Sequence, residues 1–436
     1  MTSPQRCVAL VLVAALVGPA STATAQPPSV TRHVLANGMT VIVRENPLAP
    51  VVAVSLQVRT GLRAETPETA GVTNLLVRTM IRGTARRSGA ALAETAEGLG
   101  GSLDASGEVE SAEIRGEALA RHWGDLLGLI AEVALEPALL EAEIERERRL
   151  ILSQIQTRAE APFELSLDTL LHQLYGDHPY AWQRLGLKAA IGRLGRADLV
   201  AHYRGVFQAA RTVLAVSGQV SSPRVVKTAE RLFAKFPSSS VGEVGAVASA
   251  MPSGERRALE RPAQQAQILV GYLGPALNDP AYPAVRVLGA VLGGGTAGRL
   301  FAELREKRGL AYSLGVLTPF RTGPAFVVAH LGTAPENAAA AEAALLAELE
   351  RVRQAPVDDH ELARAKAYLI GTFSMDRRTN ARQAWYLAFF EVIGAGWDFA
   401  DRYARALEAV TAADVESTAR RYLVRPTIVV LRPPAR

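Results

Sequence analysis

The chain has 436 residues, of which 49% are hydrophobic and 21% are charged, so it can bury a large core and is neither disordered nor fibrous. This length exceeds what one ordinary hydrophobic core supports and favours two domains. The formal net charge of +5 is small for the size, and basic residues alternate with acidic ones, which excludes the basic footprint of a nucleic-acid-binding protein.

The first 25 residues have the pattern of a signal peptide. Arg6 supplies a positive start, residues 8–17 form an apolar run too short to cross a bilayer comfortably, and residues 23–25 form a small-x-small cleavage site. We therefore expect a mature chain that begins at Gln26, is periplasmic or secreted, and has no later membrane span. An uncleaved amphipathic anchor is the alternative. The only cysteine, Cys7, lies in this segment, which excludes cysteine catalysis and cysteine-ligated metals in the mature chain.

The mature chain shows the same order of elements twice. In the first half, valine-rich strands are expected at residues 41–43 and 51–58, and further strands around residues 103–116. Helices of the first half are expected at residues 70–81, 90–99, 117–133 and 137–158, the last of them dense in charged helix formers.

A stretch rich in Ser, Gly, Val and Ala at residues 237–256 indicates an interdomain linker between an N-terminal domain, residues 26–236, and a C-terminal domain, residues 257–436. The two tandem copies of interleaved strands and helices indicate an α+β or layered α/β fold with helices over one face of each sheet. In the second half, strands are expected at residues 266–272, 311–319, 325–331 and 427–431, and helices at residues 281–292, 299–307, 336–354, 360–374 and 412–422.

The helix expected at residues 70–81 belongs to the segment GVTNLLVRTMIRGTARR, which spans residues 71–87. Metallopeptidases can place an H-x-x-E-H motif on such a helix, because two histidines four residues apart lie on one face and both reach the metal. The glutamate beside the second histidine polarises the metal-bound water as general base. No H-x-x-E-H occurs in this chain.

The same segment nevertheless resembles, without gaps, the zinc-motif segment of the pitrilysin/insulinase peptidase family, which includes the mitochondrial processing peptidases. The match begins at Gly71 and ends in a hydrophobic-basic-Gly-Thr run at residues 80–84. It places Asn74 at the first histidine, Val77 at the glutamate and Arg78 at the second histidine. A carboxamide is a poor zinc ligand, valine cannot move a proton, and arginine brings a permanent positive charge.

In the family, the third zinc ligand is a glutamate on a later helix, in an E-R-x-x-x-x-x-E-like stretch. Within the similar stretch here, residues 145–154, the ligand position falls on Gln154, and Glu147, one heptad earlier, matches a second carboxylate that supports the site. The resemblance therefore implies a degenerate site that holds no metal. Two interpretations of Arg78 follow: a solvated helix arginine, or a guanidinium that occupies the metal position and pairs with Glu147.

The second half contains GGGTAGRLF at residues 293–301 and ELREKRGLAYS at residues 303–313. The glycines lack the Gly-Lys-Ser/Thr end of a phosphate loop. The longer run is similar to the family stretch G-G-x-x-S-R-L-F-x-x-[IL]-R-E-[KR]-x-G-L-A-Y-S, in which an arginine and a tyrosine seven residues apart reach the substrate near the zinc. The resemblance implies that Arg305 and Tyr312 bind substrate, the first through paired donors and the second through its hydroxyl.

A local role is the alternative for these two residues. Arg305 would then cap the helix or pair with Glu303 or Glu306, and Tyr312 would be a half-buried strand residue.

The resemblance covers nearly the whole mature chain and implies two tandem homologous domains, each a mostly antiparallel sheet covered by helices, in a two-layer metallopeptidase fold. In some bacterial members, a zinc-bearing chain pairs with one that lacks the zinc motif but supplies the arginine and tyrosine. We therefore expect a secreted, non-catalytic subunit without catalytic residues of its own. It would bind an extended peptide and complete the active site of an H-x-x-E-H partner chain, with zinc only in the partner.

Two further interpretations stay open. One is a structural or peptide-binding homologue with no proteolytic role, like the non-catalytic core subunits of respiratory complexes that resemble this family. The other is an active enzyme with a different metal arrangement, for which the sequence offers no ligand set.

Overall fold

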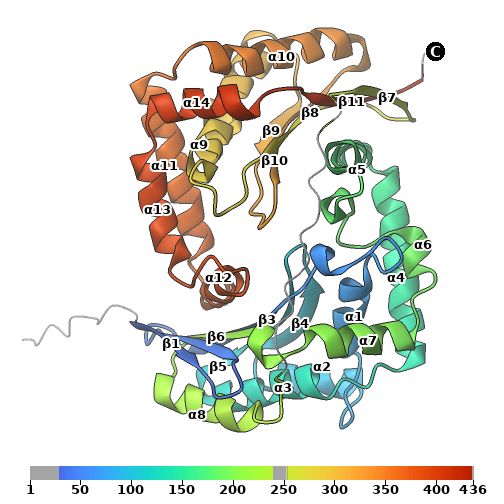
Figure 1. The fold of residues 1–436 in the computed structure, drawn as a ribbon, viewed down its shortest axis with the longest axis vertical. Coiled ribbons are helices and arrows are strands. Elements are labelled where there is room, and N and C mark those ends of the chain that lie inside the picture. Colours follow the sequence, from blue (N-terminus) through green and yellow to red (C-terminus); the bar gives the residue numbers. More distant parts are fainter. Residues whose placement is uncertain (1–28, 239–251, 253, 435–436) are drawn as a thin grey trace, which may run out of the picture.

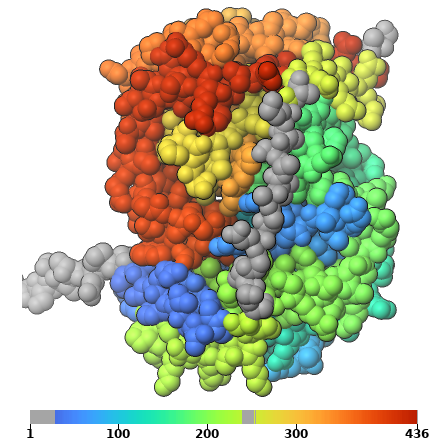
Figure 2. Space-filling view, viewed as in Figure 1, coloured from blue at the N-terminus to red at the C-terminus, as the bar shows by residue number. Residues whose placement is uncertain are grey.

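The computed structural model describes residues 29–238, 252 and 254–434, which form two sheets with helices packed on them (Figure 1). The predicted signal peptide lies outside the described residues, as does most of the predicted linker. In the space-filling view, the N-terminal half (blue to green) and the C-terminal half (orange to red) pack against each other (Figure 2). No helix in the described ranges is both long and apolar enough to span a membrane.

The N-terminal sheet has six strands in the order β1-β2-β6-β3-β5-β4. Neighbouring strands run antiparallel except β2 and β6, which run parallel, so the expected mostly antiparallel sheet is confirmed. In chain order the strands are β1 (Ser29–Val34), β2 (Thr40–Glu45), β3 (Val51–Arg59), β4 (Ser102–Gly107), β5 (Ser111–Leu119) and β6 (Thr212–Gly218).

Helices of the same half cover one face of this sheet and enclose its main core. Leu56 and Ile114 of the sheet pack with Leu75, Leu76 and Ile130 of the helices, and all five are fully or almost fully buried. The helices of this half are α1 (Val72–Met80), α2 (Gly89–Gly98), α3 (Trp123–Leu135), α4 (Glu141–Glu160), α5 (Pro162–Tyr175), α6 (Lys188–Ile191), α7 (Arg196–Val206) and α8 (Ser222–Leu232).

The helix predicted at residues 117–133 begins too early, because β5 extends to Leu119 and α3 starts only at Trp123. The burial of β5 explains the error: Arg115 and Glu117 are exposed, whereas Gly116 and Ala118 are buried. This alternation has the period of a strand and continues into the residues that were assigned to the helix.

The C-terminal sheet has five strands in the order β7-β11-β8-β10-β9, and only β7 and β11 run parallel. The strands are β7 (Arg256–Glu260), β8 (Ala266–Gly274), β9 (Ser313–Leu317), β10 (Ala325–Thr333) and β11 (Thr427–Arg432). The helices of this half are α9 (Tyr282–Gly293), α10 (Ala338–Gln354), α11 (Asp359–Asp376), α12 (Asn380–Val392), α13 (Phe399–Ala409) and α14 (Ala412–Tyr422).

The second face of each sheet is covered by one helix from the opposite half, an exchange that the sequence did not predict. Helix α12 lies on β3 and β6, where Leu387 and Ala388 pack against Ala53 and Ala215. Helix α5 lies on β8 and β11. Figure 1 shows α12 above the N-terminal sheet and α5 beside the C-terminal one. The two halves are therefore joined by buried apolar surface on both sheets.

Polar contacts fix the exchanged helix α12. The Arg59 guanidinium donates to the Val392 carbonyl over 2.7 Å, Arg32 pairs with Glu391 at 2.7 Å, and the Asn46 amide donates to Asn380 over 2.9 Å. These bonds satisfy groups at both ends of the helix and orient it on the sheet.

Candidate functional site

Helix α1 carries the three degenerate motif positions, and a buried carboxylate sets where it begins. Glu65 accepts hydrogen bonds from the backbone N–H groups of Gly71 (2.8 Å) and Thr73 (3.0 Å), which satisfies donors at the free end of the helix. Burial raises the pKa of the Glu65 carboxyl, although those same hydrogen bonds oppose the shift. Gly71 has φ 97°, and a Cβ there would meet the Gly186 backbone at 2.8 Å, so only glycine fits.

His202 of α7 holds the first turn of α1 from the side. Its Nε2 lies 3.0 Å from the Thr73 hydroxyl, and burial lowers the pKa of the imidazole to about 4.

We predict that His202→Gln flattens the pH dependence of stability. Between pH 6.5 and about 4, the His202 imidazole takes up a proton in the unfolded chain but stays neutral in the folded chain. The free energy of unfolding therefore has its full value above pH 6.5 and decreases as the pH falls towards 4. Because the side chain is partly exposed, we expect the loss to be about 2 kcal/mol. Urea denaturation at pH 7 and pH 4.5 measures it. Exposed His360→Gln is the control, and equal slopes in both variants would contradict the assignment.

The first two motif positions of α1 are buried and non-ionic. Asn74, at the first histidine position, is 5% exposed, and its Nδ2 has no hydrogen-bond partner within the described part of the chain. Val77, at the glutamate position, is fully buried in the N-terminal core. Neither side chain can act as a proton acceptor for water.

Arg78, at the second histidine position, makes the contacts that the second interpretation required. Its Nε donates to Glu147 Oε2 over 2.8 Å, and its Nη1 donates to Gln154 Oε1 over 2.8 Å. Arg82, one turn further along, donates to Glu147 Oε1 over 2.6 Å. Glu147 is fully buried, whereas the Arg78 side chain is 19% exposed. The predicted pairing of Arg78 with Glu147 is confirmed, and Arg78 is not a solvated helix arginine.

The family resemblance implies a zinc ion at this site in relatives. The side chains that this chain has at positions 74, 77, 78 and 154 do not fit such an ion. Arg78 bonds both Glu147 and Gln154, so its guanidinium lies between the groups that would face a dication. A guanidinium repels a dication and cannot be deprotonated. Among the described residues, no group of three or more His, Cys, Asp or Glu side chains is placed to hold a metal ion.

Arg305 and Tyr312 lie together on the surface of the C-terminal half. Arg305 belongs to a π-helical segment, Phe301–Lys307, and its Nη1 donates to the Tyr312 carbonyl over 2.9 Å. Its guanidinium also lies over the Phe301 ring, 5.1 Å from the centroid. Tyr312 is 62% exposed and directly precedes β9. The π-helical winding was not predicted from the sequence, and such segments occur frequently at functional sites.

The local alternative for these two residues holds only in part, because the Arg305 guanidinium bonds a neighbouring carbonyl, that of Tyr312, rather than an acidic side chain. Glu303 pairs with Lys307 at 2.6 Å, and no ion pair of Arg305 with Glu303 or Glu306 occurs in the described ranges. Tyr312 is exposed rather than half-buried. Within those ranges, no hydrogen bond or ion pair joins Arg305 or Tyr312 to Arg78 or to the residues that Arg78 bonds, Glu147 and Gln154. The structure thus leaves both side chains accessible to a ligand or partner.

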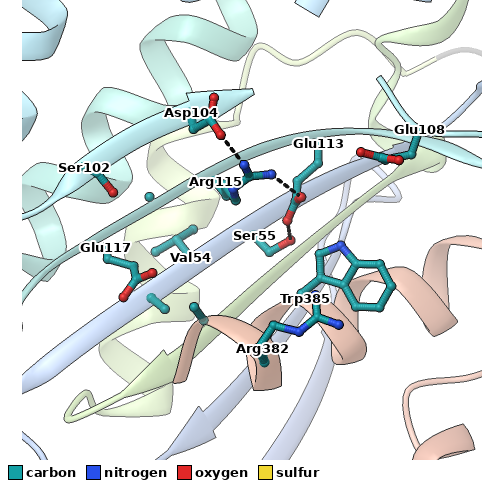
Figure 3. Close-up of a pocket in the computed structure, with 13 residues that line it drawn as sticks. Val54, Ser55, Ser102, Asp104, Glu108, Glu113, Arg115, Glu117, Arg382 and Trp385 are labelled. Carbon is teal, nitrogen blue, oxygen red and sulfur yellow. Dashed lines mark hydrogen bonds and ion pairs between the residues drawn. The ribbon is translucent and has the colours of Figure 1, made fainter. Parts of the chain in front are cut away.

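A cavity of about 450 Å³ between the N-terminal sheet and α12 was missed by the sequence reasoning (Figure 3). At its wall, Arg115 bonds Asp104 and donates to Glu113 over 3.1 Å, and the Ser55 hydroxyl donates to Glu113 over 2.6 Å. Burial raises the pKa of the Glu113 carboxyl, against the opposing effect of Ser55 and Arg115. The alternating charges at residues 113, 115 and 117 of β5 are the sequence signal that could have revealed this face.

Helix α12 closes the cavity from the opposite half. Figure 3 shows Arg382 and Trp385 facing the sheet, and the Arg382 guanidinium lies over the Trp385 ring, 4.5 Å from the centroid. Carboxylates outnumber guanidinium groups in the lining, which gives the cavity a negative charge. The charged lining residues are Asp104, Glu108, Glu113, Arg115, Glu117 and Arg382.

The fold and the degenerate motif together define a peptidase-like chain, and comparison with protein families agrees. Residues 40–186 match the model described as Insulinase (Peptidase family M16), and residues 193–369 match the Peptidase M16 inactive domain. The chain belongs to the insulinase, or M16, peptidase family, as the sequence resemblance predicted.

Relatives and solved structures extend over almost the whole chain. A protein called an uncharacterized zinc protease from Rickettsia bellii (strain RML369-C) is 26% identical over 395 residues, 89% of this chain and 93% of the relative. A peptidase M16 inactive domain from Pseudomonas fluorescens superposes with a TM-score of 0.85 at 24% identity, covering 93% of this chain and 98% of that one. A protease from Helicobacter pylori gives 0.86 at 19% identity, covering 94% and 100%. These structures confirm the two-domain α+β fold.

Proposed function

We propose that this chain is an exported, non-catalytic subunit of a zinc metallopeptidase. It binds an extended peptide and completes the active site of a partner chain that carries H-x-x-E-H and the zinc ion. The observation that carries the proposal is the pair of hydrogen bonds from Arg78 to Glu147 and Gln154. Through these bonds the guanidinium fills the metal position with a cation that cannot activate water.

The retained surface residues support a role in substrate binding rather than in structure alone. The Arg305 guanidinium bonds the Tyr312 carbonyl and no carboxylate among the described residues, so it has further N–H donors for a ligand. The phenol of Tyr312 is exposed. Arginine donors can bind a peptide carbonyl or carboxylate, and a tyrosine hydroxyl can donate to an oxygen that gains charge. In the proposed complex, these groups act beside the partner's zinc.

The N-terminal sheet offers a place for an extended peptide. Strand β4 is the last strand in the order of that sheet and pairs only with β5 among the described strands. A peptide can add to such an edge through main-chain hydrogen bonds, while its side chains enter neighbouring pockets. The acidic cavity beneath α12 includes Ser102 and Asp104 of β4, so a polar or basic side chain of that peptide would enter it.

Mixing experiments test the pairing with a zinc-bearing subunit. The partner to use is a secreted H-x-x-E-H homologue encoded beside this chain, and we expect the two to co-purify. We also expect a fluorogenic peptide to be cleaved by the mixture and not by this chain alone. Absence of a complex, with the partner equally active by itself, would favour the homologue without a proteolytic role.

We predict that Arg305→Ala lowers kcat/KM of the mixture by about 10- to 100-fold, because it removes a charged hydrogen-bond donor to the substrate. Arg308→Ala is the matched control, since Arg308 is an exposed arginine next to the same segment. We expect the thermal midpoint of the Arg305→Ala chain to stay within about one degree of the parent, because surface changes cost little. Unchanged activity would reject the role of Arg305.

A further inference from the structure

A second cavity, of about 440 Å³, lies where the two halves meet beside the degenerate metal site. Its volume falls in the range of roughly 300–1,000 Å³ typical of small-ligand pockets. The N-terminal half supplies most of the wall, and the C-terminal half supplies Arg321 and Phe326. The apolar lining consists mainly of Leu62, Val109, Leu167, Leu171, Leu185 and Phe326.

Three of the four charged side chains that line this cavity are arginines, and two of these three are paired with carboxylates. Arg158 pairs with Asp168 at 2.8 Å and with Glu164 at 2.5 Å, and Arg184 pairs with Glu108 at 3.1 Å. Arg321 has no carboxylate within 4 Å among the described residues; it lies over the Tyr180 ring and donates to the Phe320 carbonyl over 3.1 Å. A partly buried guanidinium that forms no direct ion pair favours an anionic ligand.

The cavity adjoins the degenerate metal site at one residue, Gln154. Gln154 lines the cavity and also accepts the hydrogen bond from Arg78. A group bound in the cavity therefore lies next to Gln154, where this chain has an amide and a guanidinium in place of a metal and its ligands. In this chain, the position where the family resemblance places a zinc ion in relatives therefore lies next to a cavity whose Arg321 suits an anionic ligand.

The backbone that carries Arg321 is held firmly. The neighbouring residue, Thr322, donates its hydroxyl to Glu110 over 2.7 Å and its backbone N–H to the same carboxylate over 3.1 Å. Glu110 is buried and also accepts from the Tyr180 hydroxyl at 2.5 Å. Because Glu110 and Tyr180 belong to the N-terminal half, these bonds fix Arg321 relative to the cavity wall.

We propose that this cavity binds the C-terminal residue of a peptide, with its carboxylate on Arg321 and its large apolar side chain among the leucines. A C-terminal apolar residue carries both groups on one Cα, which matches a lining that presents a guanidinium beside hydrocarbon. An acidic side chain would bring the charge without the apolar surface. The inference deepens the peptide-binding part of the proposed function and does not require the zinc-bearing partner.

Fluorescence anisotropy of labelled ten-residue peptides on the full mature chain alone tests the proposal. The peptide with a free C-terminal phenylalanine should bind about 10- to 100-fold more tightly than the same peptide ending in phenylalanine amide, because the amide lacks the charged acceptor. A peptide ending in serine acid should also bind more weakly than the phenylalanine acid. Equal binding of acid and amide would overturn the proposal, as would tight binding of a peptide amide whose last residue is glutamate.

Variants assign the effect to Arg321. Arg321→Gln should remove the preference for acid over amide and leave binding of the amide peptide unchanged, whereas Arg321→Lys should retain most of the preference. Arg86→Gln, an exposed arginine that lines neither cavity, is the control and should retain it in full. Preference retained in Arg321→Gln would overturn the assignment. Absence of binding by every peptide would overturn the inference, while cleavage by the mixture with the partner tests the proposed function separately.

Discussion

A chain carrying Asn74→His, Arg78→His and Gln154→Glu is expected to bind one zinc ion, whereas the parent chain binds none. The backbone already provides the geometry, because residues 74 and 78 lie four apart on α1 and Gln154 lies within 2.8 Å of the Arg78 guanidinium. Two imidazoles and a carboxylate are a standard three-ligand set for a catalytic zinc site. Zinc content after dialysis, measured by mass spectrometry and by isothermal titration, checks the expectation.

The control for this experiment keeps the guanidinium. A chain with Asn74→His and Gln154→Glu but with Arg78 intact should stay free of zinc, because it has one ligand fewer and a fixed positive charge in the site. Adding Val77→Glu to the three-ligand chain supplies the general base and should leave zinc binding in place. Stoichiometric zinc in the parent chain, or no zinc in the folded three-ligand variant, would contradict the account of the site.

The helix that carries the degenerate site could be predicted because its signals are local. Helical periodicity placed residues 74, 77 and 78 on α1 to within two residues of its bounds, and the heptad spacing of Glu147 and Gln154 put both on one face of α4. The pairing of Arg78 with Glu147 was one of the two interpretations that the sequence left open, and it rested on the need to compensate a carboxylate beside the vacated metal position. The bond from Arg78 to Gln154 and the second arginine on Glu147 needed the structure.

The exchange of α5 and α12 between the two sheets could not be predicted, because a local pattern does not say which sheet a helix covers. The sequence of β3 did contain a sign, because residues 51–54 form an unbroken apolar run instead of an alternating pattern, and the structure shows residues 52–58 buried on both faces. The second cavity escaped prediction for the same reason. Its wall joins Leu62 and Leu171 to Arg321, which are distant in sequence and meet only through the exchange.

The Arg78→Leu chain is expected to lose about 3 kcal/mol of folding free energy. Glu147 is fully buried, so removing Arg78 leaves its charge with a single partner, Arg82, whose side chain is 36% exposed. Breaking a buried ion pair by removing one partner commonly costs about 3–5 kcal/mol, and the remaining arginine reduces the loss. Urea denaturation followed by far-UV circular dichroism gives the free energy by linear extrapolation.

Arg86→Leu separates this effect from the general loss of an arginine. Arg86 pairs with Glu136 at 2.6 Å, but the two side chains are 65% and 36% exposed, so we expect a much smaller loss of stability than in Arg78→Leu. The double variant Arg78→Leu with Glu147→Leu should recover most of the stability, because no uncompensated carboxylate then remains in the core and Arg82 can turn towards water. If Arg78→Leu costs no more than Arg86→Leu, the guanidinium does not neutralise the carboxylate that relatives keep beside their zinc.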